Sequence, residues 1–163
     1  MAILRLFGLY FMMTFLMVIV GLVVGAYFGS DPFSGMFIFL IIAIAINIFS
    51  YFYSDTLVLK AYGARIIERQ DSPRLYGMVK NIANINDLPM PRIAIVDSST
   101  PNAFATGRNP KNAVVAATTG LMSILDDNEL EGVMAHEMAH VKNRDTLVMC
   151  VAATIAGAIA FAA

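Results

Sequence analysis

The sequence predicts an α+β membrane protein that begins with a transmembrane helical hairpin and continues into a small cytoplasmic domain of helices and a short sheet. Of its 163 residues, 58% are hydrophobic and only 14% are charged, with a mean hydropathy of +0.70. Soluble domains carry roughly 25% charged residues, so this balance favours a membrane protein. Two long uncharged runs come first, and mixed helix and strand patterns follow them. We expect a hairpin over residues 1–54, a domain over 55–145 and a third hydrophobic segment over 146–163.

The first uncharged run extends from Leu6 to Gly29 and is long enough for a membrane-spanning helix, which needs about 20 residues. A cleaved signal peptide is the alternative interpretation. Arg5 is the only basic residue before the run, the run exceeds the usual 7–15 apolar residues, and a second span follows at once. We therefore interpret residues 6–29 as an uncleaved span. Gly21 and Gly25 form a G-x-x-x-G pattern that is weak evidence for a helix-packing face.

A second span is predicted over residues 33–53, after the turn signal Gly29-Ser30-Asp31-Pro32. It ends in Tyr51-Phe52-Tyr53, which is typical of an aromatic belt at the membrane interface. Asn47 lies inside it, and we expect this side chain to form a hydrogen bond between the two helices rather than to have a functional role.

The basic residues predict the orientation of the hairpin. The turn carries only Asp31, whereas Lys60, Arg65, Arg69 and Arg74 follow the second span closely. The positive-inside rule then directs the N-terminus and everything after Asp55 to the cytoplasm. The net charge of −1 and the lack of a long basic run argue against nucleic acid as a partner.

The domain over 55–145 has recognisable helix and strand signals. The second span is expected to continue as a helix to about residue 62, and Ser72-Pro73 marks the start of another helix with Pro at its first position. The apolar stripe of that helix is formed by Leu75, Met78, Val79, Ile82 and Ile85. The elements predicted after it are a strand over 92–97, a strand pair over 102–107 and 113–119, and a short helix over 120–125. The strand pair is either a plain structural sheet or a sheet whose edge binds substrate backbone by strand addition.

The third hydrophobic segment, residues 146–163, is barely long enough to span a bilayer. It is either the start of a third transmembrane helix or a buried core helix. The single cysteine, Cys150, lies within it, so a disulfide framework is excluded and a thiolate metal ligand is not expected.

Five residues carry the chemistry: His136-Glu137-Met138-Ala139-His140, an H-E-x-x-H pattern that contains both histidines of the chain. Residues four apart lie on one helix face about 5–6 Å apart, so both imidazoles can reach one Zn²⁺ ion. Glu137 lies close enough to act on a water molecule activated by the metal. This is the arrangement of a zinc hydrolase, in which the metal acidifies a water and the carboxylate takes its proton.

A surface helix that merely carries two histidines is the alternative, and the context argues against it. The N-cap candidates are Asp126, Asp127 and Asn128. Glu129 and Glu131 follow in the first turn, where the helix dipole favours acidic side chains. An apolar stripe at helical spacing is formed by Leu130, Val133, Met134 and Val141, and basic Lys142 and Arg144 follow at the C-terminal end.

A third protein ligand is not evident. Catalytic zinc sites use three protein ligands and an open position, yet no His or Glu follows His140. Asp145 is the only carboxylate downstream. We expect it to orient an imidazole or to end the helix rather than to bind the metal itself.

Three stretches together resemble the HtpX-type membrane metalloproteases: residues 136–145 (HEMAHVKNRD), residues 101–107 (PNAFATG) and residues 118–121 (TTGL). The two preceding spans agree with this resemblance. It implies a zincin-like fold of the gluzincin type and a multi-pass zinc endopeptidase of the prokaryotic plasma membrane, with a cytoplasmic active site. The implied task is quality control of misfolded or damaged membrane proteins.

Residue by residue, the resemblance implies that His136 and His140 are zinc ligands and that Glu137 is the general base. Asn102, Ala103 and Phe104 match a segment near the substrate cleft. The family's third ligand is a Glu on a later helix, which the resemblance sets beyond Ala163. We therefore expect an N-terminal portion of a longer protein, with one zinc per chain and an incomplete site.

Two alternatives remain. A protease site inside the bilayer is disfavoured, because the charged residues that flank the motif would be costly at membrane depth. A catalytically incomplete membrane-anchoring fragment, which binds metal loosely or not at all, is the alternative of a different class.

Overall fold

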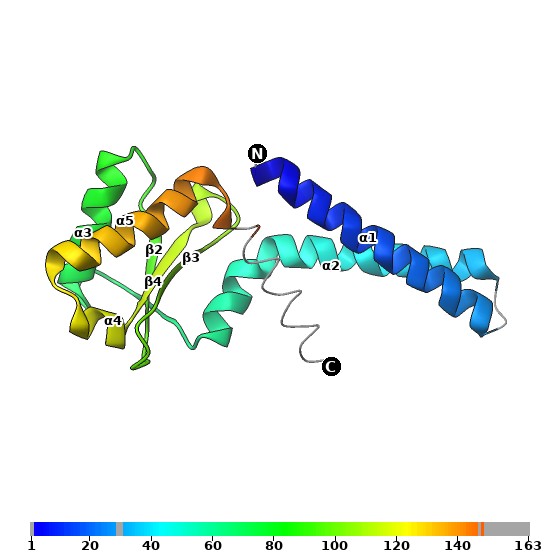
Figure 1. Ribbon diagram of the computed structural model, residues 1–163, viewed down its shortest axis with the longest axis horizontal. Coiled ribbons are helices and arrows are strands. Elements are labelled where there is room, and N and C mark those ends of the chain that lie inside the picture. Colours follow the sequence, from blue (N-terminus) through cyan, green and yellow to red (C-terminus); the bar gives the residue numbers. More distant parts are fainter. Residues whose placement is uncertain (1, 29–30, 147, 149–163) are drawn as a thin grey trace. The chain divides into compact units, whose positions relative to one another are not determined.

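The computed structural model describes residues 2–28, 31–146 and 148 and divides the chain into two compact units, residues 1–52 and 53–163 (Figure 1). Nearly all of the predicted third hydrophobic segment, 146–163, lies outside the described residues. The predicted fold class is confirmed, because an apolar helical hairpin precedes a small domain of helices and one sheet.

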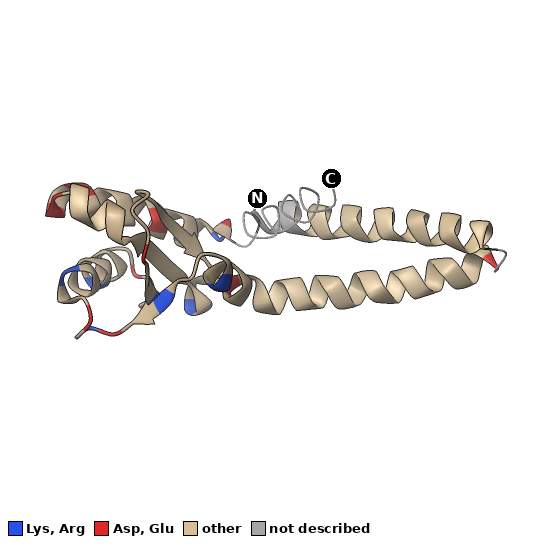
Figure 2. Ribbon diagram, turned by 90° about the horizontal axis from the view of Figure 1, so that it is seen from below, with Lys and Arg blue, Asp and Glu red and all other residues tan. Residues whose placement is uncertain are grey.

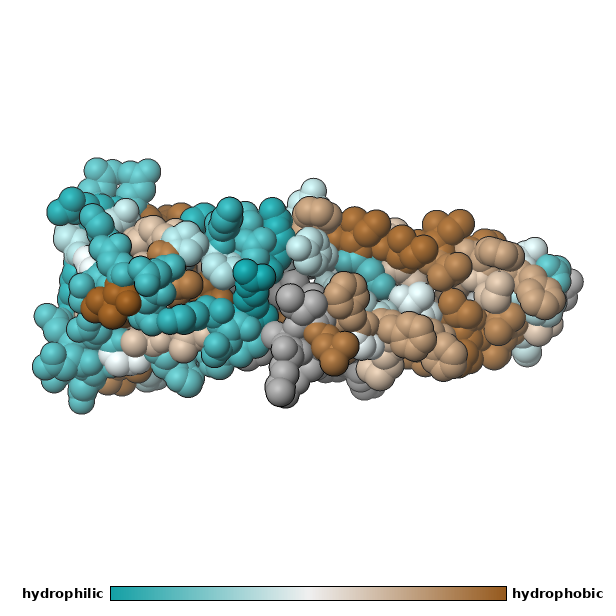
Figure 3. All heavy atoms as spheres, turned by 90° about the horizontal axis from the view of Figure 1, so that it is seen from above, coloured by the Kyte–Doolittle hydropathy of each residue, from teal (hydrophilic) through white to brown (hydrophobic). Residues whose placement is uncertain are grey.

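The first unit contains α1 (Ala2–Tyr27) and most of α2 (Pro32–Ala61). Both are long and apolar enough to cross a membrane, with mean hydropathies of 2.4 and 2.3 over their candidate spans. Their large apolar side chains are mostly exposed, which is unfavourable in water and suits a lipid surrounding (Figure 3). Figure 2 shows the charged residues concentrated on the second unit, with the hairpin helices almost entirely uncharged.

Small residues let the two hairpin helices approach closely. A side-chain carbon at Gly21 would lie 2.6 Å from the backbone oxygen of Gly35, and Gly25 also faces Gly35. The expected interhelical hydrogen bond of Asn47 is confirmed, since its Nδ2 donates to Thr14 Oγ1 at 2.9 Å. Such bonds are favourable in a membrane because the amide finds no water there.

The second unit is built on one four-stranded sheet with the order β1-β2-β4-β3. The strands are β1 (Arg65–Ile67), β2 (Arg92–Val96), β3 (Ala103–Thr106) and β4 (Val114–Thr118). β2 and β4 are parallel, whereas β1 pairs with β2 and β3 pairs with β4 in antiparallel fashion. The predicted pairing of β3 with β4 is confirmed. β1 was not predicted, and β1 and β3 are the two edges of the sheet.

Helices α3 (Pro73–Ile85), α4 (Thr119–Ile124) and α5 (Asp127–Asn143) complete the unit, and α3 and α5 pack side by side (Figure 1). The predicted start of α3 is confirmed, with Ser72 as N-cap and Pro73 at the first position. One stripe residue was predicted wrongly, because Ile85 in the last turn of α3 is 71% exposed. The main core lies between these helices and one face of the sheet and includes Leu75, Val79, Ile93, Val115, Leu130, Met134, Met138 and Val141.

The opposite face of the sheet is covered by the last turns of α2. Leu59 packs there against the buried Ala94, Val114 and Ala116. An ion pair ties the same helix end to β2, since Arg92 Nη2 lies 2.6 Å from a carboxylate oxygen of Asp55. The expected continuation of the second span as a helix into the domain is thereby confirmed.

Candidate metal centre

Helix α5 carries the H-E-x-x-H residues and is fixed at both ends. Asp126 is the N-cap and forms a capping box with Glu129, in which each side chain accepts from the other residue's backbone N–H. Arg144 ends the helix in the left-handed conformation, with a φ of 58°. One face of α5 packs into the core through four buried residues: Leu130, Met134, Met138 and Val141. Met138, inside the motif, belongs to this face and was missing from the predicted stripe.

The two histidines lie side by side on α5. Their ring centroids are 4.9 Å apart and the rings are nearly perpendicular, at 87°. The Nδ1 atom of His140 is 3.2 and 3.3 Å from the two carboxylate oxygens of Asp145. An Nδ1–H that donates to Asp145 leaves Nε2 of His140 with its lone pair available to a metal ion. The described donors, two imidazoles at helical spacing with one oriented by a carboxylate, therefore fit a zinc ion by type.

Glu137 lies between the histidines in sequence and is half-buried. Burial raises the pKa of its carboxyl above the ordinary value, while His140, His136 and a hydrogen bond from the backbone N–H of Ala105 act in the opposite direction. The net effect is a raised pKa, because desolvation disfavours the charged form more than these groups favour it. A carboxylate of this kind is suited to accepting a proton.

The hydrogen bond to Glu137 comes from β3, an edge strand of the sheet. The backbone N–H of Thr118 donates to Asn102 O at 2.9 Å, so Asn102 and the alternate residues after it face β4. Ala103 and Ala105 therefore direct their backbone N–H and C=O groups away from β4. Ala105 was missed by the sequence prediction, because its role depends on this register.

The three residues predicted near a substrate cleft have different surroundings. Asn102 is exposed, and its backbone N–H and C=O both bond to Thr118. Ala103 packs on the same face of the sheet as α5. Phe104 points to the other face, where its ring lies 4.7 Å from that of Tyr62. Only Ala103 thus shares a face with the histidine helix.

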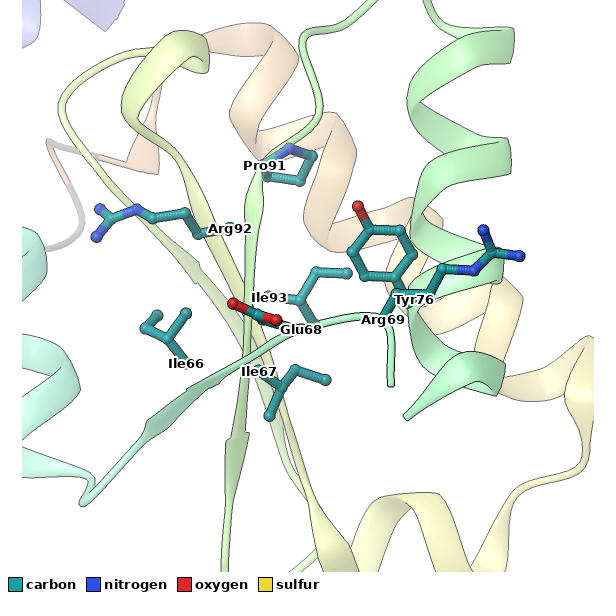
Figure 4. A pocket seen from close by; sticks show the side chains of 8 residues that line it. All are labelled: Ile66, Ile67, Glu68, Arg69, Tyr76, Pro91, Arg92 and Ile93. Atoms are coloured by element: carbon teal, nitrogen blue, oxygen red, sulfur yellow. The ribbon is translucent and has the colours of Figure 1, made fainter. Parts of the chain in front are cut away.

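The described residues contain no group of three His, Cys, Asp or Glu side chains that could hold a metal ion together. A cavity of about 380 Å³ lies beside β1, at the sheet edge opposite to β3, and includes Glu68, Arg69, Tyr76 and Arg92 in its lining (Figure 4). None of the predicted site residues lines it. The candidate metal centre is therefore the pair on α5 together with Glu137 and Asp145.

Comparison with known proteins gives a consistent result. The model of peptidase family M48 matches residues 69–163. A protease HtpX homolog of Methylibium petroleiphilum is 49% identical over 140 residues, which are 86% of this chain and 49% of that protein. A protease HtpX homolog of Thermococcus sibiricus is 53% identical over 136 residues, 83% of this chain and 46% of that protein. These matches confirm the resemblance predicted from the motifs.

The chain spans about half the length of the curated relatives that it matches. A solved structure, the crystal structure of S. mikatae Ste24p, matches 98% of this chain and 37% of its own, with a TM-score of 0.53 and 17% identity. At this identity the likeness concerns the fold.

Proposed function

Because the chain belongs to peptidase family M48, we propose that it provides the metal pair and the general base of a membrane-anchored zinc endopeptidase. The observation that carries the proposal is the arrangement on α5 and just beyond its end: two adjacent imidazoles, the carboxylate of Asp145 at 3.2 Å from His140, and a half-buried Glu137 with a raised pKa. A surface histidine without a functional role needs neither a second imidazole beside it nor an orienting carboxylate.

His136 and His140 would hold the zinc ion through ring nitrogens, and Asp145 would keep His140 in the required tautomer. When bound, zinc would acidify a water molecule and polarise the substrate carbonyl. A catalytic site needs a third protein ligand. We assign that ligand to the part of the relatives' length that this chain does not cover.

Glu137 is the proposed proton carrier. Its carboxylate would take the proton from the attacking water and then deliver it to the leaving amine when the peptide bond breaks. The pKa raised by burial makes the carboxylate a better base, because it strengthens the affinity for that proton. The hydrogen bond from Ala105 would hold the side chain beside the edge strand.

Substrate recognition is proposed to use the backbone of β3. Ala103 directs its backbone N–H and C=O groups away from β4, and Ala105 directs its C=O the same way while its N–H donates to Glu137. An extended peptide can pair with the open groups of this edge without a defined side-chain pattern. Recognition through the backbone suits a protease for misfolded or damaged membrane proteins. Quality control of such substrates at the cytoplasmic side of a prokaryotic plasma membrane is therefore the proposed role.

The test uses protein that extends over the full length of the relatives, because this chain covers about half of it. Wild-type protein should bind one zinc ion and cleave an unfolded substrate, whereas Glu137→Gln should keep the zinc and lose cleavage. Cleavage at the wild-type rate by the Glu137→Gln variant would contradict the mechanism.

A membrane-anchoring role without catalysis is the second candidate. It is favoured by one observation, namely that the described residues offer two histidines but no three-residue metal cluster. Metal analysis of the 163-residue chain separates the two. A tightly bound zinc in this chain would contradict the assignment of a third ligand elsewhere, and absence of zinc from the longer protein would favour the anchoring role.

A further inference from the structure

A second pocket lies at the C-terminal end of α5 and has a volume of about 570 Å³. Its walls come from three places in the chain: the loop after α3, the short 3-10 helix η1 (Pro110–Asn112) and the end of α5. Three cations line it, namely Lys111 on η1 and Lys142 and Arg144 at the end of α5. Asp87 is the single acidic residue in its lining. The pocket is therefore rich in positive charge.

None of these three cations forms an ion pair with a carboxylate among the described residues. Lys142 donates only to the amide oxygen of Asn86, at 3.3 Å. Arg65, Arg74 and Arg92, by contrast, all have carboxylate partners in the same unit. Within the described part of the chain, the pocket lining therefore carries three unpaired cations against the single carboxylate of Asp87, and an anion is the complementary ligand for this excess of positive charge.

The helix dipole explains part of this cluster but not all of it. Cations are favoured in the last turn of a helix, which accounts for Lys142 and Arg144. Lys111 comes from a different element, so the preference for cations in the last turn of a helix does not account for it. Arg144 also has a φ of 58°, a position where Gly or Asn is preferred, so an Arg side chain here carries a backbone cost. Asp87, the other described non-glycine residue with positive φ, lines the same pocket.

The sequence next to the pocket indicates which class of anion the pocket binds. Only Asp145 and Thr146 separate Arg144 from residues 147–163, which contain no charge. Basic residues immediately cytoplasmic to a membrane segment attract anionic lipids. We propose that Lys111, Lys142 and Arg144 bind the phosphate-bearing headgroup of an anionic phospholipid of the phosphatidylglycerol class. This inference rests on the cytoplasmic orientation in the proposed function and on the interpretation of residues 147–163 as a membrane segment, and not on zinc or catalysis.

The test is a lipid titration of the full 163-residue chain in a non-ionic detergent, read by native mass spectrometry. Dioleoyl phosphatidylglycerol is compared with dioleoyl phosphatidylcholine, which has the same acyl chains and no net charge. Each basic residue near an anionic lipid contributes roughly a fivefold change in affinity. Wild-type protein should prefer phosphatidylglycerol, and Lys111→Gln with Arg144→Gln should weaken that binding about 25-fold while leaving phosphatidylcholine unchanged.

The matched control is Arg69→Gln with Lys80→Gln, which removes the same charge from two exposed residues outside the pocket. It should bind phosphatidylglycerol within about twofold of wild type, because distant charges are screened. Lys111→Gln alone leaves α5 intact and should show about a fivefold loss, so the test survives if the double variant misfolds. Circular dichroism checks the fold of every variant.

Two results would overturn the proposal: equal losses in the pocket and control variants, or equal binding of the two lipids. Binding of a polyglutamate peptide that depends on Lys111, without lipid preference, would instead assign the pocket to an acidic protein segment. Zinc content and cleavage are measured separately, on protein of the relatives' full length, so failure of lipid binding leaves the proposed metal centre untouched.

Discussion

Arg74 stabilises the connection between α4 and α5, and its replacement should destabilise the first turn of α5. Its Nε lies 2.5 Å from Asp127 Oδ1, and its two Nη atoms donate to the backbone oxygens of Met122 and Leu125, each at 3.1 Å. One side chain on α3 thus donates to two backbone oxygens at the end of α4 and pairs with the carboxylate of the first residue of α5. Arg74→Ala removes all three contacts, whereas Asp127→Asn removes only the ionic one.

The magnitudes follow from exposure. The ion pair is largely solvated, with side-chain exposures of 39% for Arg74 and 76% for Asp127, so its contribution is about 0.5 kcal/mol. Hydrogen bonds from a charged donor contribute about 1.5–3 kcal/mol when buried, and partial exposure reduces each of the two carbonyl bonds to about 0.5–1 kcal/mol. Arg74→Ala should therefore cost about 2 kcal/mol and Asp127→Asn about 0.5 kcal/mol.

Thermal unfolding of the full chain in detergent, followed by circular dichroism, measures the difference. A loss of 2 kcal/mol corresponds to a fall in Tm of about 10 °C for a unit of this size. Hydrogen exchange should also accelerate in the connection between α4 and α5 and in the first turn of α5. Equal losses in the two variants, or an Arg74→Ala protein as stable as wild type, would refute the reasoning.

Three further predictions concern the metal centre and its supports. In metal-free protein, Glu137→Gln should increase the free energy of unfolding at neutral pH, because the raised pKa of Glu137 means that its ionised form costs stability in the folded state. This gain in the free energy of unfolding should shrink as the pH falls through the raised pKa of the folded state towards the pKa of the unfolded state. Urea titrations across that pH range measure the gain. A gain that is independent of pH would contradict the prediction. Asp145→Asn should weaken zinc binding by about tenfold in protein of the relatives' full length, as measured by chelator competition, since contacts of 3.2 and 3.3 Å place it at the low end of such effects. An unchanged affinity would remove Asp145 from the site. Gly107→Ala should lower stability by about 2–3 kcal/mol, because Gly107 has a φ of 121° and a Cβ there would lie 2.8 Å from Ala113 Cα; Gly77→Ala, on open helix surface, is the control and should not destabilise.

Local patterns in the sequence were sufficient for the elements that depend on local physics. The two spans follow from uncharged length and the start of α3 from Ser72-Pro73. The start of α5 was predicted to within three N-cap candidates, of which the structure uses Asp126, in a capping box with Glu129. The interhelical contact of Asn47 follows from the cost of an unpaired amide in lipid.

Features that depend on register or on distant partners could not be predicted in this way. β1 is three residues long and begins at an exposed Arg65, so it has no alternation to detect and exists only because β2 offers an edge. Ile85 fits the helical stripe, yet it lies in the last turn of α3, beyond the core. The opposite directions of Phe104 and Ala105 follow from the pairing of β3 with β4, and the hydrogen bond from Ala105 to Glu137 follows from the same register.

The order of elements along the chain has a consequence for biosynthesis. All four strands and α3 precede α5, and the buried face of α5 packs against α3, β3 and β4. A nascent chain emerges N-terminus first at about 5–20 residues per second, so the strands are available before the histidine helix leaves the ribosome. The histidine helix is therefore the last of these elements to be synthesised, and its buried residues complete the core on one face of the sheet. A nascent chain that has not reached α5 therefore contains the residues of the edge strand β3 but neither of the two histidines.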